Sequence, residues 1–200
     1  MQDWQRQLID LLLAKDVLRF GDFTLKSGRQ SSYFVNLGLV SDGESLAALA
    51  VVYARKIVDD LGSASFDVLF GPAYKGIPLV AGVSMALKQR FGVNRPFAFD
   101  RKEPKSYAEG GHMVGAPIES GQRVLMIDDV LTDGATKVQT IELLRHECGA
   151  QVVGVLVCVD RMEPAEQDTT QAELFTRNTG VPVHALLTKS DIEQRYGQTL

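Results

Sequence analysis

Two adjacent acidic residues, Asp128 and Asp129, follow an apolar run and precede a turn of small residues that opens a helical pattern. Such a turn presents backbone N–H groups without helical partners. With the positive end of the helix dipole, these groups suit a phosphate. The carboxylates repel phosphate, but they accept hydrogen bonds from sugar hydroxyls or hold a Mg²⁺ that bridges to phosphate. Thr132 and Thr136 add hydroxyl donors. The pattern indicates a site for a phosphorylated ribose, and an Asp that only caps a helix is the competing interpretation of the pair alone.

Residues 70–78 form a second unusual segment, Phe-Gly-Pro-Ala-Tyr-Lys-Gly-Ile-Pro. Gly71 and Gly76 lack a Cβ, so the backbone can come close to a ligand or adopt conformations that other residues avoid. Lys75 supplies a point charge beside the second glycine. Taken alone, the segment is also typical of a glycine–proline turn with a solvated lysine.

Residues 101–121 have no helical or strand periodicity and are rich in glycine, proline and charge. A stretch of about 20 residues is too long for an ordinary connection in a compact domain, so we expect a mobile functional loop. Arg101, Lys102 and Lys105 make this stretch cationic, although a charged run often does no more than face solvent.

Composition limits the classes of partner. The chain has 200 residues, a formal net charge of −4 and a pI of about 5.4, so no footprint for nucleic acid is expected. No apolar stretch is long enough to span a membrane, and charged residues interrupt the amphipathic N-terminus in a way that signal peptides avoid. Cys148 and Cys158 match no metal-binding spacing and are expected to be buried thiols. We therefore expect a cytoplasmic protein.

Strand patterns alternate with helical patterns along most of the chain. We expect strands at residues 66–70, 96–99, 123–127, 152–159 and 182–187, and short strands with turns between Phe20 and Leu37. We expect helices within residues 1–15, after a capping box at Ser41 and Glu44, at 76–91 and 135–148, and after Ser190 and Glu193. This alternation predicts an α/β fold with a central, mostly parallel sheet flanked by helices. Ligands bind such sheets beyond the carboxyl ends of the strands, where both unusual segments fall.

Four segments resemble the type I phosphoribosyltransferases, and among them the orotate phosphoribosyltransferases. Residues 124–136 match the family's signature for phosphoribosyl pyrophosphate (PRPP), and residues 70–78 resemble its pyrophosphate loop. The second likeness implies a non-proline cis peptide near Ala73–Tyr74. Residues 97–111 resemble the family's catalytic loop, and residues 23–36 resemble the hood that covers the base. The resemblance extends over about residues 1–190.

The resemblance implies a single domain over residues 1–200, with a small N-terminal hood at about 1–40, an α/β core at about 41–200 and the mobile catalytic loop at about 101–121. The implied reaction transfers the 5-phosphoribosyl group of PRPP to orotate, in pyrimidine biosynthesis, with Mg²⁺ as cofactor. Orotidine 5′-monophosphate and pyrophosphate are the products. The family shares its catalytic loop between subunits, so a homodimer is expected. A phosphoribosyltransferase for another nucleobase and a noncatalytic PRPP-binding regulator are the alternatives.

The resemblance also implies residue roles. Arg101, Lys102, Asp128 and Asp129 are the expected catalytic residues, and the two acids act on the metal mostly indirectly because PRPP carries it. Arg161 ends a buried strand, where an arginine can pair with the carboxylate of orotate. The other expected substrate-binding residues are Lys26, Phe34, Val35, Tyr74, Lys75, Lys105, Tyr107, Val130, Leu131, Thr132, Asp133, Gly134, Ala135 and Thr136.

Three of these positions depart from the family's usual residues. Val35 replaces a second Phe, and its contact through the backbone tolerates the change. Tyr107 replaces a common His, and a phenol donates a hydrogen bond but carries no positive charge; His112 is a candidate substitute. Asp133 replaces a small neutral residue and would weaken phosphate binding unless it points outward, with Lys137 offsetting part of its charge.

Overall fold

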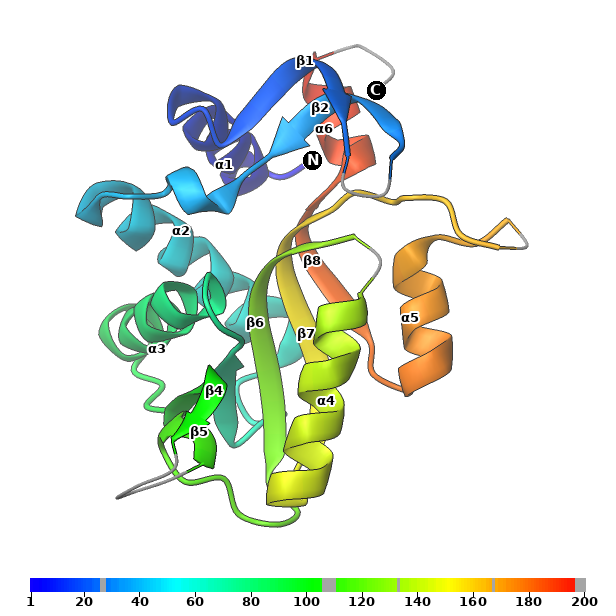
Figure 1. Cartoon of the computed structure of the whole chain (residues 1–200). Coiled ribbons are helices and arrows are strands. Elements are labelled where there is room, and N and C mark those ends of the chain that lie inside the picture. The colour runs from blue at the N-terminus through cyan, green and yellow to red at the C-terminus, as the bar shows by residue number, and fades with distance from the viewer. Residues whose placement is uncertain (26–27, 106–110, 133, 167, 197–200) are drawn as a thin grey trace.

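The computed structural model describes residues 1–25, 28–105, 111–132, 134–166 and 168–196, apart from the side chains of Pro104 and Lys105 (Figure 1). Its centre is a six-stranded sheet in the order β5-β4-β3-β6-β7-β8. The strands are β3 Val68–Gly71, β4 Phe97–Lys105, β5 Gly111–Gly115, β6 Arg123–Leu131, β7 Gln151–Asp160 and β8 Val183–Thr188. Neighbouring strands are parallel except β5, which pairs antiparallel with β4 at the edge. The predicted α/β architecture with a mostly parallel sheet is confirmed.

Helices cover both faces of this sheet (Figure 1). The helices α1 Asp3–Ala14, α2 Gly43–Lys56 and α3 Gly76–Phe91 pack on one face, together with α6 Lys189–Tyr196. The helices α4 Ala135–Cys148 and α5 Gln171–Thr179 pack on the other face. Within the described residues, no helix is long and apolar enough to cross a membrane.

Two separate hydrophobic cores result, because successive side chains of a strand point to opposite faces. On β6, Leu125 and Ile127 pack with α2 and α3, whereas Val124 and Met126 pack with α4. The strands β3 and β7 divide their side chains in the same way. These strands are therefore apolar at nearly every position, as expected for a sheet covered on both sides.

A small two-stranded sheet lies at the carboxyl end of the main sheet (Figure 1). It consists of β1 Leu18–Thr24 and β2 Gln30–Val35, paired antiparallel, and a 3₁₀ turn at Leu37–Leu39 follows it. Leu18, Tyr33 and Val35 point from these strands into the core shared with α1. We call residues 18–39 the hood, because they form a layer apart from the main sheet.

Several sequence-based expectations need correction. Residues 101–121 were expected to lack regular structure, but Arg101–Lys105 and Gly111–Gly115 belong to β4 and β5, so only part of that stretch is irregular. The helix α5 was not predicted, although its capping box of Thr170 and Glu173 is visible in the sequence. The helix α2 is capped by Asp42, which accepts a hydrogen bond from Ser45 N, and the predicted box at Ser41 and Glu44 is wrong. Thr188 and Asp191, in place of Ser190 and Glu193, exchange the capping bonds at the start of α6.

Gly71, at the end of β3, packs so closely that a side chain cannot be added there. A Cβ at this position would overlap the carbonyl of Gly76 and lie 2.7 Å from Val80 Cγ1. We predict that Gly71→Ala lowers the free energy of unfolding by about 1–3 kcal/mol, the usual range for overpacking. Gly43→Ala is the matched control, since its Cβ meets no atom within 4 Å. Urea unfolding of both variants tests this, and equal stability of the two would contradict it.

Candidate active site

Asp128 and Asp129, the two acidic residues of the predicted ribose site, lie near the end of β6, at the carboxyl edge of the sheet. Each residue is only 8% exposed. Asp128 Oδ2 lies 2.6 Å from Lys137 Nζ, and Asp129 Oδ2 lies 2.8 Å from Lys75 Nζ. Each carboxylate therefore has its own ammonium partner, one from α4 and the other from the loop before α3.

The pair of Asp128 and Lys137 is buried on both sides. Lys137 is 6% exposed, and its Nζ also donates a hydrogen bond of 2.7 Å to Val130 O. Burial raises the pKa of Asp128 above its ordinary value, while Lys137 opposes that shift by favouring the ionised carboxylate. The sequence suggested Lys137 only as an offset for Asp133, which lies outside the described residues. The structure shows it as the partner of Asp128.

Tyr53, a fully buried residue of α2, lies next to the acidic pair. Its hydroxyl donates a hydrogen bond of 2.8 Å to the backbone oxygen of Asp128. Burial, the largest cause, raises the pKa of this phenol well above its ordinary value, so it remains a neutral donor. No sequence pattern indicated that Tyr53 contacts β6.

The loop between β3 and α3 brings Lys75 to Asp129. Its peptide bond Ala73–Tyr74 is cis, as the family resemblance implied. The buried Asp100 of β4 fixes the loop, since its Oδ1 accepts a hydrogen bond of 2.6 Å from Ala73 N. Tyr74 is 71% exposed, and half of the Lys75 side chain faces solvent. Both side chains are accessible to a ligand above the acidic pair.

The turn after β6 ends at the start of α4, where the sequence predicted a phosphate site. Gly134 has a φ of 75° and leads directly into α4, and a Cβ there would lie 2.7 Å from Phe175 Cδ2. Thr132, Ala135 and Thr136 are exposed around this turn. Leu131 is 1% exposed, and Val130 is partly buried. The backbone of Val130 is already engaged, because its N–H donates to Asp129 Oδ1 and its oxygen accepts from Lys137 Nζ. Asp133 lies outside the described residues.

The expected catalytic cations fall in different places. Arg101 is turned toward β5, where its Nη1 donates to the backbone oxygens of Gly111 and Met113 at 3.2 and 3.4 Å. Lys102 is exposed on β4. Tyr107 and the side chain of Lys105 lie outside what the structure describes. His112 Nδ1 lies 2.8 Å from Glu147 Oε1 in the last turn of α4, away from the turn at Gly134.

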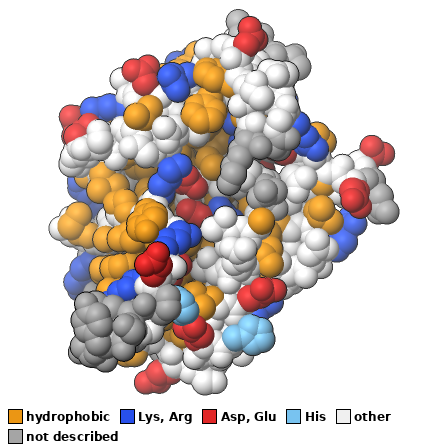
Figure 2. Space-filling model, viewed as in Figure 1, with side chains coloured by type: hydrophobic (Ala, Val, Ile, Leu, Met, Phe, Trp, Pro, Cys, Tyr) orange, Lys and Arg blue, Asp and Glu red, His pale blue; other side chains and the backbone are white. Residues whose placement is uncertain are grey.

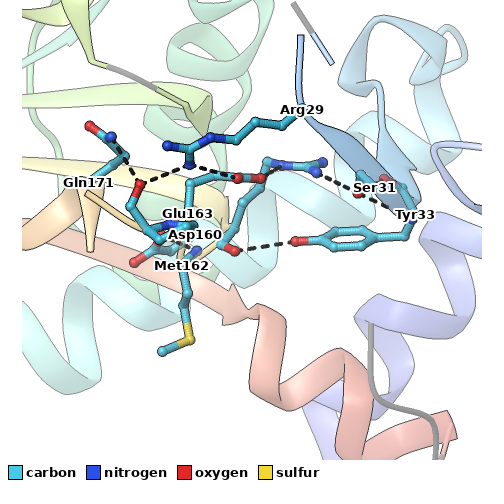
Figure 3. Close-up of polar contacts among 9 residues, drawn as sticks. Arg29, Ser31, Tyr33, Asp160, Met162, Glu163 and Gln171 are labelled. Carbon is cyan, nitrogen blue, oxygen red and sulfur yellow. Dashed lines mark hydrogen bonds and ion pairs between the residues drawn. The ribbon is translucent and has the colours of Figure 1, made fainter. Parts of the chain in front are cut away.

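The second half of the site is a cavity of about 370 Å³ between the hood and the segment after β7. Arg161 contributes to its wall. So do four residues that Figure 3 labels: Arg29, Ser31, Tyr33 and Glu163. Ligand pockets for small molecules begin at about this size. The guanidinium of Arg161 is 4% exposed and lies over the ring of Tyr33, 4.4 Å from its centroid.

The hood residues named from the sequence differ in accessibility. Phe34 is partly exposed and stacks on Phe23 with ring centroids 5.5 Å apart. Val35 is 7% exposed and packs into the core, so only its backbone is available to a ligand. Lys26 lies outside the described residues. Near the middle of the face in Figure 2, acidic and basic side chains lie next to one another below the hood.

The comparisons with known proteins agree with this geometry. The model of the family described as "Phosphoribosyl transferase domain" matches residues 40–185. An orotate phosphoribosyltransferase of Methylococcus capsulatus is 46% identical over 187 residues, which cover 94% of this chain and 85% of that protein. This chain belongs to the orotate phosphoribosyltransferase family.

Further orotate phosphoribosyltransferases support the same assignment. The Pseudomonas fluorescens protein is 43% identical over 194 residues, covering 97% of this chain and 89% of that protein. The crystal structure of the Francisella tularensis orotate phosphoribosyltransferase has a TM-score of 0.83 and 39% identity, covering 97% of this chain and 91% of that chain. The likeness extends over the hood as well as the sheet, and the hood lies outside the matched range of the domain model.

The two lysine–aspartate pairs give a matched test of burial. We predict that Lys137→Met lowers the free energy of unfolding by about 3–5 kcal/mol near neutral pH, because it leaves Asp128 buried without a counter-charge. Lys75→Met should cost about 0–1 kcal/mol, because half of the Lys75 side chain is in solvent.

The loss in free energy of unfolding caused by Lys137→Met should also depend on pH. In the folded variant the pKa of Asp128 is raised above that of the unfolded chain, so stability is lost as pH rises through the unfolded value of about 4. The variant therefore loses less free energy of unfolding in acid than at neutral pH. Urea unfolding across pH measures both effects, and equal costs for the two lysine variants would contradict the assigned burial.

Proposed function

We propose that this enzyme transfers the 5-phosphoribosyl group of PRPP to orotate, releasing pyrophosphate and forming orotidine 5′-monophosphate. The observation that carries the proposal is the pairing of Asp129 with Lys75 next to the buried pair of Asp128 and Lys137, whose lysine lies in the first turn of the helix that starts after Gly134. A diol, a pyrophosphate and a 5′-phosphate each find suitable groups there. The membership of the family and the relatives' shared name support this reading.

The donor would be held in three parts. Asp129 and Asp128 accept hydrogen bonds from the ribose hydroxyls, and their charge favours the electron-poor sugar as the bond at C1 weakens. The backbone at residues 132–136 binds the 5′-phosphate at the start of α4. Lys75, Lys102, Lys105 and Arg101 neutralise the negative charge that builds on the departing pyrophosphate.

The residues present fit a Mg²⁺ that arrives with PRPP. Within the described residues, no cluster of three or more His, Cys, Asp and Glu side chains could hold a metal ion. Mg²⁺ commonly binds through one or two carboxylates, waters and substrate phosphates, which a site of two carboxylates allows. Asp129 is the more available of the two acids, because Lys75 is exposed while Lys137 is buried with Asp128. When bound, the metal supplies charge neutralisation at the pyrophosphate.

The acceptor would lie in the cavity under the hood. We assign the orotate carboxylate to Arg161, because a buried guanidinium on the cavity wall is well suited to a planar anion. Phe34 and Lys26 would cover the ring from the hood. Closure of residues 101–121 over the site would exclude water that could hydrolyse the activated sugar.

We test this function by following the loss of orotate ultraviolet absorbance on addition of PRPP, with and without Mg²⁺. We expect consumption of orotate that requires PRPP and falls when the metal is chelated. Uracil, hypoxanthine and adenine serve as competing acceptors, because a transferase for another base would prefer one of them. Preference for any of these over orotate would overturn the assignment of the acceptor.

We predict that Lys102→Ala lowers turnover about 10²-fold, the usual effect of removing one preorganised charge from a transition state. Lys88→Ala is the matched control, since Lys88 is an exposed lysine near the end of α3. Both variants should unfold at the same urea concentration as the wild type. Turnover near normal in Lys102→Ala would remove this residue from the mechanism.

We propose a homodimer in which each catalytic loop acts on the neighbouring site. Apolar side chains gather over α2 and α3 on the face shown in Figure 2. Leu39 before α2, Tyr74 before α3 and Met85 within α3 are 40%, 71% and 53% exposed, and such exposure is typical of an interaction surface. The free thiols Cys148 and Cys158 suit the reducing environment of the cytoplasm, where we place the enzyme.

A mixing experiment tests the shared sites. We expect Lys102→Ala and Lys75→Ala chains each to lose about 10²-fold in turnover, because each lacks one cation at the pyrophosphate. If Lys102 serves the partner's site and Lys75 its own, a hybrid dimer retains one intact site. We therefore predict partial recovery of activity after the two variants exchange subunits. Hybrids that form, as judged by native mass spectrometry, and yet turn over no faster than the separate variants would contradict shared sites.

A further inference from the structure

The guanidinium of Arg161 is held by two parts of the chain that are distant in sequence, the hood and the segment after β7. Figure 3 labels the residues that contact it, which are Ser31, Tyr33 and Glu163. Its Nε donates a hydrogen bond of 2.9 Å to Glu163 Oε1, and its Nη2 donates one of 2.9 Å to Ser31 Oγ. Tyr33 lies against the face of the group. The arginine is thus fixed in position and in rotation by one residue after β7 and two residues of the hood.

Glu163 also reaches a second cation. Its Oε2 lies 3.6 Å from Arg29 Nη1, and that same nitrogen donates a hydrogen bond of 2.8 Å to Pro164 O. Arg29 belongs to the hood turn that precedes β2, so Glu163 bridges an arginine of the hood and an arginine of the core (Figure 3). The Glu163 side chain is 18% exposed and the Arg29 side chain is 48% exposed, so solvent reaches this ion pair from the Arg29 side.

These contacts leave one edge of the guanidinium for a ligand. Arginine carries five N–H donors in a rigid plane, on Nε, Nη1 and Nη2. Glu163 uses Nε and Ser31 uses Nη2, whereas Nη1 makes no hydrogen bond within the part of the chain that the structure describes. An incoming carboxylate can therefore bind at Nη1 without displacing Glu163.

We propose that Glu163 is a positioning residue for the acceptor, orienting Arg161 so that its unused edge receives the carboxylate of orotate. This inference rests on the proposed function of the cavity. It also implies that the hood helps to position Arg161, because Ser31 contacts Arg161 and Arg29 contacts Glu163.

If Glu163 competed with the substrate for Arg161, removing its charge would have the opposite effect on the binding of orotate. If Glu163 occupied the place that the substrate carboxylate needs, it would compete with orotate, and its removal would improve binding. The separate nitrogens used by Glu163 and Ser31 favour positioning, as does the division of the Glu163 charge between Arg161 and Arg29.

The test uses steady-state kinetics of the full chain with Glu163→Gln, which keeps the shape of the side chain and removes its charge. We expect the KM for orotate to rise about tenfold, the equivalent of losing about 1.4 kcal/mol of binding, within the range for one hydrogen bond to a charged group. The KM for PRPP and kcat should stay within about twofold, because no contact to the donor site is changed.

Two further variants separate positioning from a general loss of structure. Glu166→Gln removes the same charge from an exposed position three residues later and should leave both KM values unchanged. Ser31→Ala removes the second anchor of Arg161 without changing any charge, and should raise the KM for orotate in the same direction even if Glu163→Gln does not fold.

The outcomes are distinct. An unchanged or lowered orotate KM in a folded Glu163→Gln, or in Ser31→Ala if the former does not fold, overturns the positioning role. A wild-type chain that consumes no orotate overturns the proposed function itself, before any variant is compared.

Discussion

Two carboxyl groups held side by side near the end of one buried strand are the constraint on which this structure depends. Each acid is mostly out of water, and isolated charges there would be costly. The fold meets this requirement with one lysine on each side: Lys137 from the first turn of α4 and Lys75 from the loop that follows β3. Because β3 and β6 are neighbouring parallel strands, their loops emerge at the same edge. Sheet topology thus places the balancing charges.

The same arrangement explains why the two acids need not play equal parts. Asp128 is held by a buried lysine and, at its backbone oxygen, by Tyr53, so it has little freedom to exchange partners. Asp129 shares its lysine with solvent and can accept a ligand by releasing it. In the proposed reaction, Asp128 would keep its partner, whereas Asp129 would exchange its lysine for a ligand. The difference follows from the lysines, since the two acids are equally buried but Lys137 is buried and Lys75 is half exposed.

Much of the fold could be predicted from the sequence because its signals are local. The helices at 76–91 and 135–148 were predicted with the observed limits, since Gly92 and Gly149 end them in the left-handed conformation that glycine favours. The helix α5 was missed because Phe175 is its only buried residue, which gives too weak an apolar stripe. The strands β4 and β5 were missed where their polar residues resemble a loop.

The family resemblance correctly implied the cis peptide, but no local pattern distinguishes Asp128's partner among the nearby lysines. Contacts such as those of Tyr53 with Asp128 and of Arg161 with Ser31 join residues 75 and 130 positions apart, so only the folded chain reveals them.

The hydrogen bond from Ala73 N to Asp100 ties together two segments that reach the site from different directions. Asp100 immediately precedes Arg101 and Lys102, while Ala73 stands two residues before Lys75. The loop that carries one cation and the strand that carries two others therefore share a common anchor at their base. Loss of the Asp100 carboxylate would therefore disturb both segments at once. A buried residue at the base of the sheet edge would in this way change the position of cations on two different elements.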